Sequence, residues 1–249
     1  MLYSLLLASV GEGAKAGESA GHAGGHHGSG PLFHLFGLEV TSEVTTMWAI
    51  MAVIIVIAFL STRNLKRVPS GLQNFVETVL EALVGIYTST LGEKKAWRFL
   101  PFLGTMFLFI IIANYSGLLP GAGMVPGFVP PTSNLSVTLG LASIVFVMTH
   151  FSGMRDNGVG TYLKHFIEPV PFLLPINVLE EFVKPLSLSL RLYGNIFGEE
   201  MALAAALLIV PLFLPTGIMG LSLIFGFIQA FIFTVLASVY IDTATSGGH

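Results

Sequence analysis

Long apolar runs, each followed by polar or basic residues, dominate the chain and predict a set of membrane-spanning helices. One run covers about 44–61 and ends directly before a basic cluster, and similar runs follow at about 100–119 and 135–153. A hydrocarbon core about 30 Å thick needs roughly 20 apolar residues of helix to cross it. Each of these three runs therefore predicts one membrane span.

The segment at about 70–90 has a different, amphipathic pattern. Apolar residues recur at helical spacing along one face, while Gln73, Asn74, Glu77 and Glu81 line the other face. Basic clusters flank the segment on both sides, so the positive-inside bias places both of its ends on the cytoplasmic side. We expect this helix to lie along the inner membrane interface without crossing the membrane.

The last third of the chain contains two apolar segments that are long for a simple crossing. The first covers 171–213, and its helix-compatible part would extend about 50 Å at 1.5 Å per residue. The second covers 216–242, and a loop with two prolines joins the two segments. Because about 50 Å exceeds the hydrocarbon thickness, the pattern predicts an antiparallel hairpin that tilts strongly, lies partly in the membrane plane or breaks.

Together these patterns predict an all-α polytopic membrane protein with about five membrane-embedded helices and one interfacial amphipathic helix. Residues 32–249 are expected to form a single membrane domain. Residues 1–31 are rich in Gly, Ala, His and Ser, which cannot bury a core, and we interpret them as a flexible outer tail. A cleaved leader is the alternative, although no basic residue precedes the apolar run of this tail.

Composition supports the membrane class and excludes several kinds of site. The chain is 53% hydrophobic and only 10% charged, with a mean hydropathy of +0.81, whereas ordinary globular proteins are about 25% charged. The net charge of −3 points to no particular partner. The chain has no cysteine, which excludes disulfides, thiolate catalysis and cysteine-ligated metals. We expect neither a cofactor nor a bound metal.

Basic residues gather in three clusters, which give the expected orientation. The clusters are Arg63, Lys66 and Arg67; Lys94, Lys95 and Arg98; and Arg155 with Lys164. By the positive-inside bias all three belong in the cytoplasm. The loops 120–134 and 211–217 contain no Lys or Arg and are therefore expected to face outward.

Arg191 stands out because it lies within the apolar run 186–210. A guanidinium stays protonated and costs about 2.5–3.5 kcal/mol near the bilayer centre, so such a residue indicates a transport or charge-handling site. The polar residues of this segment share one helix face with spacings of 4, 7, 4 and 4: Glu180, Lys184, Arg191, Asn195 and Glu199. Glu199 is about 12 Å from Arg191 along the helix axis, so the counter-charge of Arg191 is expected outside this chain.

Other polar residues of this region allow two interpretations each. Glu180, Glu181 and Lys184 either line an inner-side channel or form an interfacial ion pair at the membrane surface. Gln229, the only strongly polar side chain within the long apolar run of the last segment, either lines an ion path or makes an interhelical hydrogen bond. His150 is either a packed residue or a proton relay. A series of small residues at every fourth position favours close helix packing: Gly194, Gly198, Ala202 and Ala206.

Four motifs make the sequence similar to a known family. The string Lys-Pro-Leu-Ser-Leu-Ser-Leu-Arg-Leu-Tyr-Gly-Asn at 184–195 strongly resembles the signature of subunit a of F-type rotary ATP synthases. The strings Asn-Tyr-Ser-Gly-Leu-Leu-Pro-Gly at 114–121, Pro-Thr-Ser-Asn-Leu-Ser-Val-Thr-Leu at 131–139 and Gln-Ala-Phe-Ile-Phe at 229–233 fit the same family. The resemblance covers roughly residues 32–243.

This resemblance implies an ion-conducting stator subunit with two half-channels, which couples transmembrane proton flow to rotation of a c-ring and to ATP synthesis. Arg191 matches the essential arginine of the family, and Asn195, Glu200 and Gln229 match polar residues that line the ion path. The implied partners are the c-ring proteolipids, the peripheral-stalk b subunits and membrane lipid, with no nucleic acid and no nucleotide bound by this chain. The implied location is the bacterial plasma membrane, with the N-terminus outside and the C-terminus in the cytoplasm.

The chain departs from the family pattern at two positions. Ser222 stands where some members have a histidine near the outer channel, and Asn134 stands where many members have an acidic residue. The outer relay is therefore expected to depend on Glu200, with Glu199, Ser222 and water.

Two other classes of function would require different features of the sequence. A secondary transporter or ion channel could use Arg191 as a counter-charge, but it predicts an internal repeat with matching broken helices, and the sequence has none. An intramembrane enzyme needs a nucleophile with its base, or a metal site. The sequence contains neither a His-Glu-x-x-His motif nor a nucleotide-binding glycine loop, so we expect no catalytic activity from this chain alone.

Overall fold

The computed structural model describes residues 33–35, 38–63, 71–119, 129–162, 172, 174–209 and 213–246. Its helices are α2 (Ser42–Thr62), α3 (Leu72–Leu91), α4 (Glu93–Ser116), the short 3-10 helix η1 (Pro131–Ser133), α5 (Leu135–Asn157), α7 (Leu174–Ile209) and α8 (Phe213–Thr245). Over this part of the chain, four helices are long and apolar enough to cross a membrane: α2, α4, α5 and α8. The predicted all-α polytopic membrane fold is confirmed. The tail at 1–31 lies outside the described residues.

One element was not predicted from the sequence. Strands β1 (Phe33–Leu35) and β2 (Leu38–Val40) form an antiparallel hairpin before α2, with Phe33 opposite Val40. Strands of three residues are too short to show a clear alternation of apolar and polar positions, which explains the omission.

Helix α4 begins at Glu93, earlier than the predicted start at about 100. The apolar pattern shows only the membrane-spanning part of α4, because its first two turns carry basic residues that are also good helix formers. Gly92 alone separates α3 from α4, and its φ of 73° is a left-handed conformation that glycine adopts without strain. Lys94, Lys95 and Arg98 therefore lie on a helix and not in a loop.

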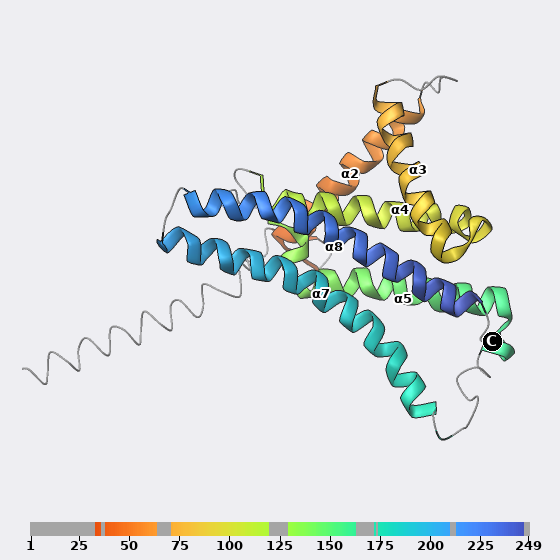
Figure 1. The fold of residues 1–249 in the computed structure, drawn as a ribbon. Helices are drawn as coiled ribbons and strands as arrows, with labels where there is room; N and C mark the ends of the chain where they lie inside the picture. Colours follow the sequence, from red (N-terminus) through yellow and green to blue (C-terminus); the bar gives the residue numbers. More distant parts are fainter. Residues whose placement is uncertain are drawn as a thin grey trace, which may run out of the picture.

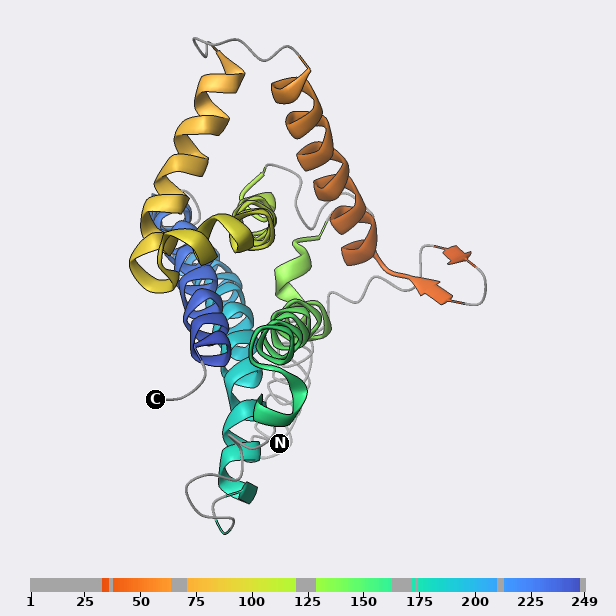
Figure 2. The ribbon, with the colours of Figure 1, turned by 90° about the vertical axis from the view of Figure 1, so that its right-hand side faces the viewer.

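Helix α3 runs across the direction of α4 and α8 and not alongside it, as Figures 1 and 2 show. It packs its apolar face on these two helices, burying Leu83, Tyr87 and Leu91, while Phe75 is exposed. The amphipathic pattern of the sequence thus describes a helix that is half buried against the bundle. This arrangement agrees with the prediction that α3 is not a span.

Helices α4, α5, α7 and α8 lie side by side and form the main bundle (Figure 1). Large side chains of α4 and α8, such as Phe99, Ile110 and Phe233, fill its core. Gly226 lets α8 approach α4 closely, because a Cβ atom at this position would lie 3.1 Å from the Tyr115 ring. The Asn114 amide then donates a hydrogen bond of 3.1 Å to the Gly226 carbonyl.

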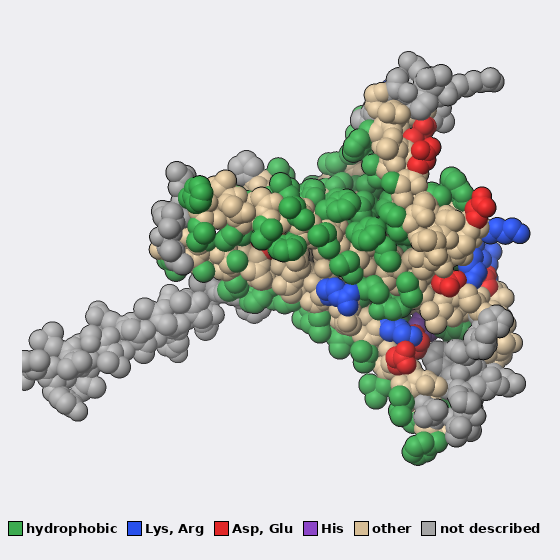
Figure 3. Space-filling model, in the orientation of Figure 1, with side chains coloured by type: hydrophobic (Ala, Val, Ile, Leu, Met, Phe, Trp, Pro, Cys, Tyr) green, Lys and Arg blue, Asp and Glu red, His purple; other side chains and the backbone are tan. Residues whose placement is uncertain are grey.

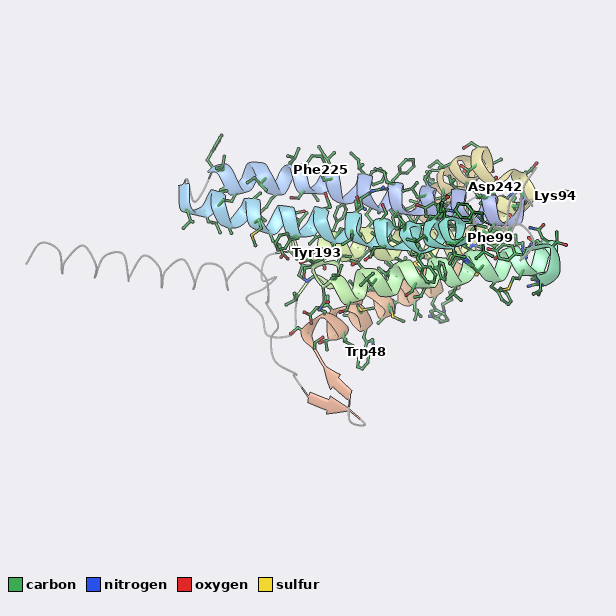
Figure 4. All side chains as sticks on the ribbon, turned by 90° about the horizontal axis from the view of Figure 1, so that it is seen from below. Trp48, Lys94, Phe99, Tyr193, Phe225 and Asp242 are labelled. Atoms are coloured by element: carbon green, nitrogen blue, oxygen red, sulfur yellow. The ribbon has the colours of Figure 1, made fainter. Side chains whose placement is uncertain are left out.

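One end of the bundle carries the charged residues of α4, α5 and α8, and we call it the basic end. The other end, where α4 and α7 finish and α5 and α8 begin, is called the opposite end. Figure 4 shows Lys94 and Asp242 together at the basic end. Three polar contacts join the helices there: Lys95–Asp242 at 3.1 Å, Arg98–Asp156 at 2.8 Å, and the Asn157 amide to the Ala244 carbonyl at 2.9 Å.

Helices α7 and α8 form the predicted long antiparallel hairpin. With 36 and 33 residues, they extend about 54 and 50 Å at 1.5 Å per residue, which is longer than a perpendicular crossing requires. Pro185 lies inside α7, where it removes one backbone hydrogen bond and bends the helix. Figure 1 shows the N-terminal part of α7 diverging from α5 and α8.

Candidate functional site

Arg191 lies on the outward face of α7, near the middle of the helix. Its side chain is exposed in the isolated chain, as is that of Leu190, whereas Leu188 and Leu192 are buried against the bundle. Figure 3 shows two basic patches over α7, one beside acidic side chains and one surrounded by hydrophobic ones. Lys184 and Arg191 are the two basic residues of this helix, and Lys184 forms ion pairs with Glu180 and Glu181.

No carboxylate of the described residues lies within ion-pairing distance of the Arg191 guanidinium. The described ion pairs join other cations to their acids, including Lys184 to Glu181 and Arg98 to Asp156. Glu199 and Glu200, the nearest acids along α7, are about two turns away. A guanidinium in apolar surroundings is stable only with a compensating anion or water, and the described residues supply no such anion to Arg191.

The surface around Arg191 is formed by small residues. Gly194, Gly198 and Ala202 lie on the same side of α7 as Arg191, and we call these four residues the Arg191 face. A Cβ atom added to either glycine would meet no heavy atom within 4 Å. The series predicted from the sequence also included Ala206, but Ala206 is buried inside the bundle. The Arg191 face is therefore a shallow strip that no helix of the described chain covers.

Helix α8 places two predicted polar residues against α7. The Ser222 hydroxyl of α8, which donates a hydrogen bond of 3.0 Å to the Ile218 carbonyl, lies near the carboxyl group of Glu199 of α7. Because the two helices are antiparallel and rise equally per residue, this contact sets Gln229 at about the level of Leu192. The side chains of Ser222 and Gln229 are only 4% and 6% exposed. The structure thus brings Glu199 to Ser222 and Gln229 to the level of Arg191.

Two amide groups near this level lack partners. Gln229 Nε2 and Asn195 Nδ2 are buried and make no hydrogen bond within the described part of the chain. A buried donor without an acceptor costs about 1–3 kcal/mol, so such groups usually meet water or a ligand. Glu200 is half-buried, next to Glu199 on the following position of α7. These side chains supply hydrogen-bonding groups between Arg191 and the opposite end.

A second polar group connects α5 and α7 on the basic side of Arg191. The Lys184 ammonium lies 2.6 Å from Glu181 and 3.5 Å from Glu180, so all three predicted inner-side residues are brought together. His150 Nε2 of α5 lies 3.8 Å from Glu181. The other ring nitrogen of His150 is 2.9 Å from the Phe146 carbonyl, which orients the imidazole toward α7.

Two small cavities adjoin this ion-pair group. Thr149, Glu181, Lys184 and Tyr240 line both of them, and the larger, about 30 Å³, has room for ordered water. The Thr149 hydroxyl is buried without a partner in the described chain, which also favours bound water there. The sequence did not single out Thr149 or Tyr240, because only the fold brings them to the charged residues of α7.

Tyr162, just beyond α5, borders the larger cavity. Burial, and then the negative charge of Glu181, raise the pKa of Tyr162 to about 12. The phenol therefore stays protonated near neutral pH and can donate a hydrogen bond but not accept a proton as a base would. Over the described residues, no group of three acidic or histidine side chains could hold a metal ion.

Comparison with known proteins identifies the family. The family model described as ATP synthase A chain matches residues 44–242, a range that includes Arg191 and every polar residue of α7 and α8 considered above. The chain is 42% identical over 216 residues to ATP synthase subunit a of Moorella thermoacetica, covering 87% of this chain and 96% of that relative. With a polytopic helical fold and a match over most of its length, the chain belongs to the ATP synthase A chain family.

Proposed function

We propose that this chain is the ion-conducting stator subunit of an F-type ATP synthase, which couples proton flow to rotation of a c-ring and to ATP synthesis. The observation that carries the proposal is the Arg191 face, a cation without a counter-charge among the described residues, on a strip of small residues that is open to a neighbouring helix. Its partners are the c-ring proteolipids and the peripheral-stalk b subunits. Catalysis on nucleotides takes place in other subunits.

The chemistry of Arg191 explains how such a face would act. A carboxyl group of the ring that faces lipid has to be protonated, because an isolated charge in hydrocarbon is prohibitively unstable. When this group reaches Arg191, the guanidinium stabilises the carboxylate, and the proton is released. The guanidinium does not release its own proton, so ions cannot pass directly across it. Each ion instead travels with the ring, driven by about 2.3 kcal/mol per charge per 100 mV.

The two half-channels would lie on either side of Arg191. Toward the opposite end, which is the outer side in this proposal, Asn195, Glu199, Glu200, Ser222 and Gln229 provide the polar path. Toward the basic end, which faces the cytoplasm, the cavities beside Glu181 and Lys184 provide a hydrated one. Glu180 contributes a further acid at that entrance. This orientation places the N-terminus outside and the C-terminus in the cytoplasm of a bacterial cell, in its plasma membrane.

Purification from the native membrane tests the assignment to the stator. The intact complex is expected to contain this chain with a small two-helix proteolipid that carries one intramembrane acid. Gly198→Leu should lower the recovery of that proteolipid, because the added side chain projects from the Arg191 face. Gly140→Leu on α5, which also enters open space, is the matched control and should leave recovery unchanged. Purification of the chain with no proteolipid would contradict the proposal.

Glu200→Gln is expected to slow proton flux while leaving the complex assembled, because the amide keeps the size of the carboxyl group but cannot exchange a proton. The rate of gradient-driven ATP synthesis in proteoliposomes measures the effect. Glu93→Gln, an exposed acid at the basic end, serves as the control. Unchanged flux in Glu200→Gln would remove Glu200 from the path without affecting the role of Arg191.

A further inference from the structure

A buried acid lies on α2, away from the polar residues of α7 and α8. The Glu43 side chain is only 5% exposed although it belongs to the first turn of its helix. One carboxyl oxygen lies 3.5 Å from the Asn134 amide nitrogen, and the other has no hydrogen-bond partner in the described part of the chain. No described cation forms an ion pair with it. Glu43 is thus a carboxyl group almost removed from bulk solvent, and its side chain makes one long hydrogen bond to the described residues.

The residues around Glu43 are polar and held in place by backbone contacts. Asn134 accepts a hydrogen bond of 2.9 Å from the Ser136 backbone N–H, which caps α5 and directs the Asn134 amide nitrogen toward Glu43. The Thr46 hydroxyl accepts a hydrogen bond of 3.3 Å from the Val129 N–H. Thr132 of η1, which packs on α2, is fully buried, and its hydroxyl has no partner among the described residues.

A structural role alone does not explain this arrangement. An acid in the first turn stabilises a helix through the helix dipole, but it does so equally well when exposed to solvent. Burying the carboxyl group against η1 with one oxygen unsatisfied is unfavourable, and such groups in native proteins usually serve a ligand, water or a proton. Of the polar side chains around it, only the carboxyl group of Glu43 exchanges protons readily, while the hydroxyls can pass them on.

The location of Glu43 links it to α7. Figure 2 shows the N-terminal end of α2 beside η1 and the start of α5, and η1 also contacts α7. The Thr138 and Ser189 hydroxyls lie 3.1 Å apart, which fixes the level of α5 against α7. Since these helices are antiparallel, Asn134 lies at about the level of Tyr193, roughly half a turn from Arg191 toward the opposite end. The unpartnered amide of Asn195 belongs to the same level.

We propose that Glu43 is a proton-exchanging group of the half-channel at the opposite end. Its unpartnered oxygen takes a proton from water on that side and returns it to water that leads past Asn134 and Thr132 toward Asn195. One proton is bound and one is released, and no bond other than O–H changes. The inference rests on the proposed stator function, and it extends the path to α2, which carries none of the residues singled out from the sequence.

Few other charges influence this group. The described parts of η1, the last two turns of α4 and the first two turns of α5 contain no Lys, Arg, His, Asp or Glu. The charged residues of α4 lie at its basic end. Glu77 and Glu81 belong to α3, which follows the other end of α2, and that end is about 28 Å from Glu43 along the helix axis. The other titratable groups toward the opposite end are His34 and Glu39 of the β hairpin before α2 and Glu199 and Glu200 of α7. The part of the outer-pH dependence that belongs to Glu43 is therefore the part that changes in Glu43→Gln, where those four groups are kept.

The experiment measures ATP synthesis by the reconstituted whole complex while the pH on the outer side is varied, with the inner pH and membrane potential held constant. Glu43→Gln is expected to lower the rate about tenfold or more and to change its dependence on outer pH, while the dependence on inner pH stays the same. Glu43→Asp, which keeps the acid, should recover part of the rate. Glu93→Gln is the matched control, since Glu93 is a first-turn acid that is exposed at the basic end.

Two outcomes would overturn the assignment of Glu43. One is a Glu43→Gln complex with the rate and outer-pH dependence of the unmodified complex. The other is a Glu43→Gln complex that does not assemble while Glu43→Asp does, because this result would make Glu43 a structural acid. Either result leaves the stator function standing if Arg191→Ala still abolishes synthesis, so failure of this inference is distinguishable from failure of the proposed function.

Discussion

Arg191→Ala is expected to abolish ATP synthesis driven by the ion gradient while leaving the complex assembled. The substitution removes the only cation that can stabilise an ionised ring carboxylate at the Arg191 face of the described chain. The substitution should not disturb helix packing, because the Arg191 side chain lies outside the helix bundle and alanine is smaller. Reconstituted complexes with an imposed gradient and potential measure the synthesis, and recovery of the ring with this chain measures assembly.

Two further measurements on Arg191 sharpen this test. After removal of the catalytic sector, the Arg191→Ala membrane sector is expected to leak protons, since the barrier between the half-channels is lost. Arg191→Lys should also lose most of the activity, because a lysine ammonium is a compact charge that loses its proton more readily and lacks the planar fork of a guanidinium. Coupled synthesis at the normal rate in Arg191→Ala would refute the stator mechanism.

Gly153→Ala is expected to destabilise the protein, although the same change in an open helix position is stabilising. A Cβ atom at Gly153 would lie 2.9 Å from the Ala244 carbonyl oxygen, and it would also collide with the Tyr162 ring. The carbonyl cannot move freely because it accepts the Asn157 hydrogen bond. Crowding of this kind costs typically about 1–3 kcal/mol, so α8 should separate from α5 at the basic end.

Thermal denaturation of the purified complex in detergent, followed by loss of soluble chain, measures this effect. Gly140→Ala on the same helix is the control, because its new Cβ atom meets nothing within 4 Å and alanine favours a helix by up to about 1 kcal/mol over glycine. The two variants are therefore expected to shift the denaturation temperature in opposite directions. Equal shifts would show that the close contact of α5 and α8 does not limit stability.

The helices and the central cation could be predicted from the sequence for physical reasons. A membrane imposes one length and one polarity on each span, so apolar runs report the helices directly. A charge inside such a run is conspicuous for the same reason, and this made Arg191 recognisable. The boundary at Gly92 was not predicted, because the first turns of α4 are helical but not apolar.

Contacts between helices were harder to predict. The approach of Glu199 to Ser222 depends on the register of α7 and α8, which the spacing within one helix does not determine. Glu43 resembles an ordinary first-turn acid in the sequence, and only the position of η1 shows that it is buried. Ala206 has the spacing of the Arg191 face, yet it is buried inside the bundle. Helix periodicity assigns residues to a side of the helix but does not say where neighbouring elements cover that side.

The contacts at the basic end also have a mechanical consequence. Asp242 and the Ala244 carbonyl anchor the C-terminal end of α8 to α4 and α5, and the Gly226 carbonyl anchors the middle of α8 to Asn114 of α4. Under a sideways load, α8 would therefore be held at two levels. Its displacement would be smallest between Gly226 and Ala244 and would grow toward Phe213, so α4 and α5 would bear most of the load.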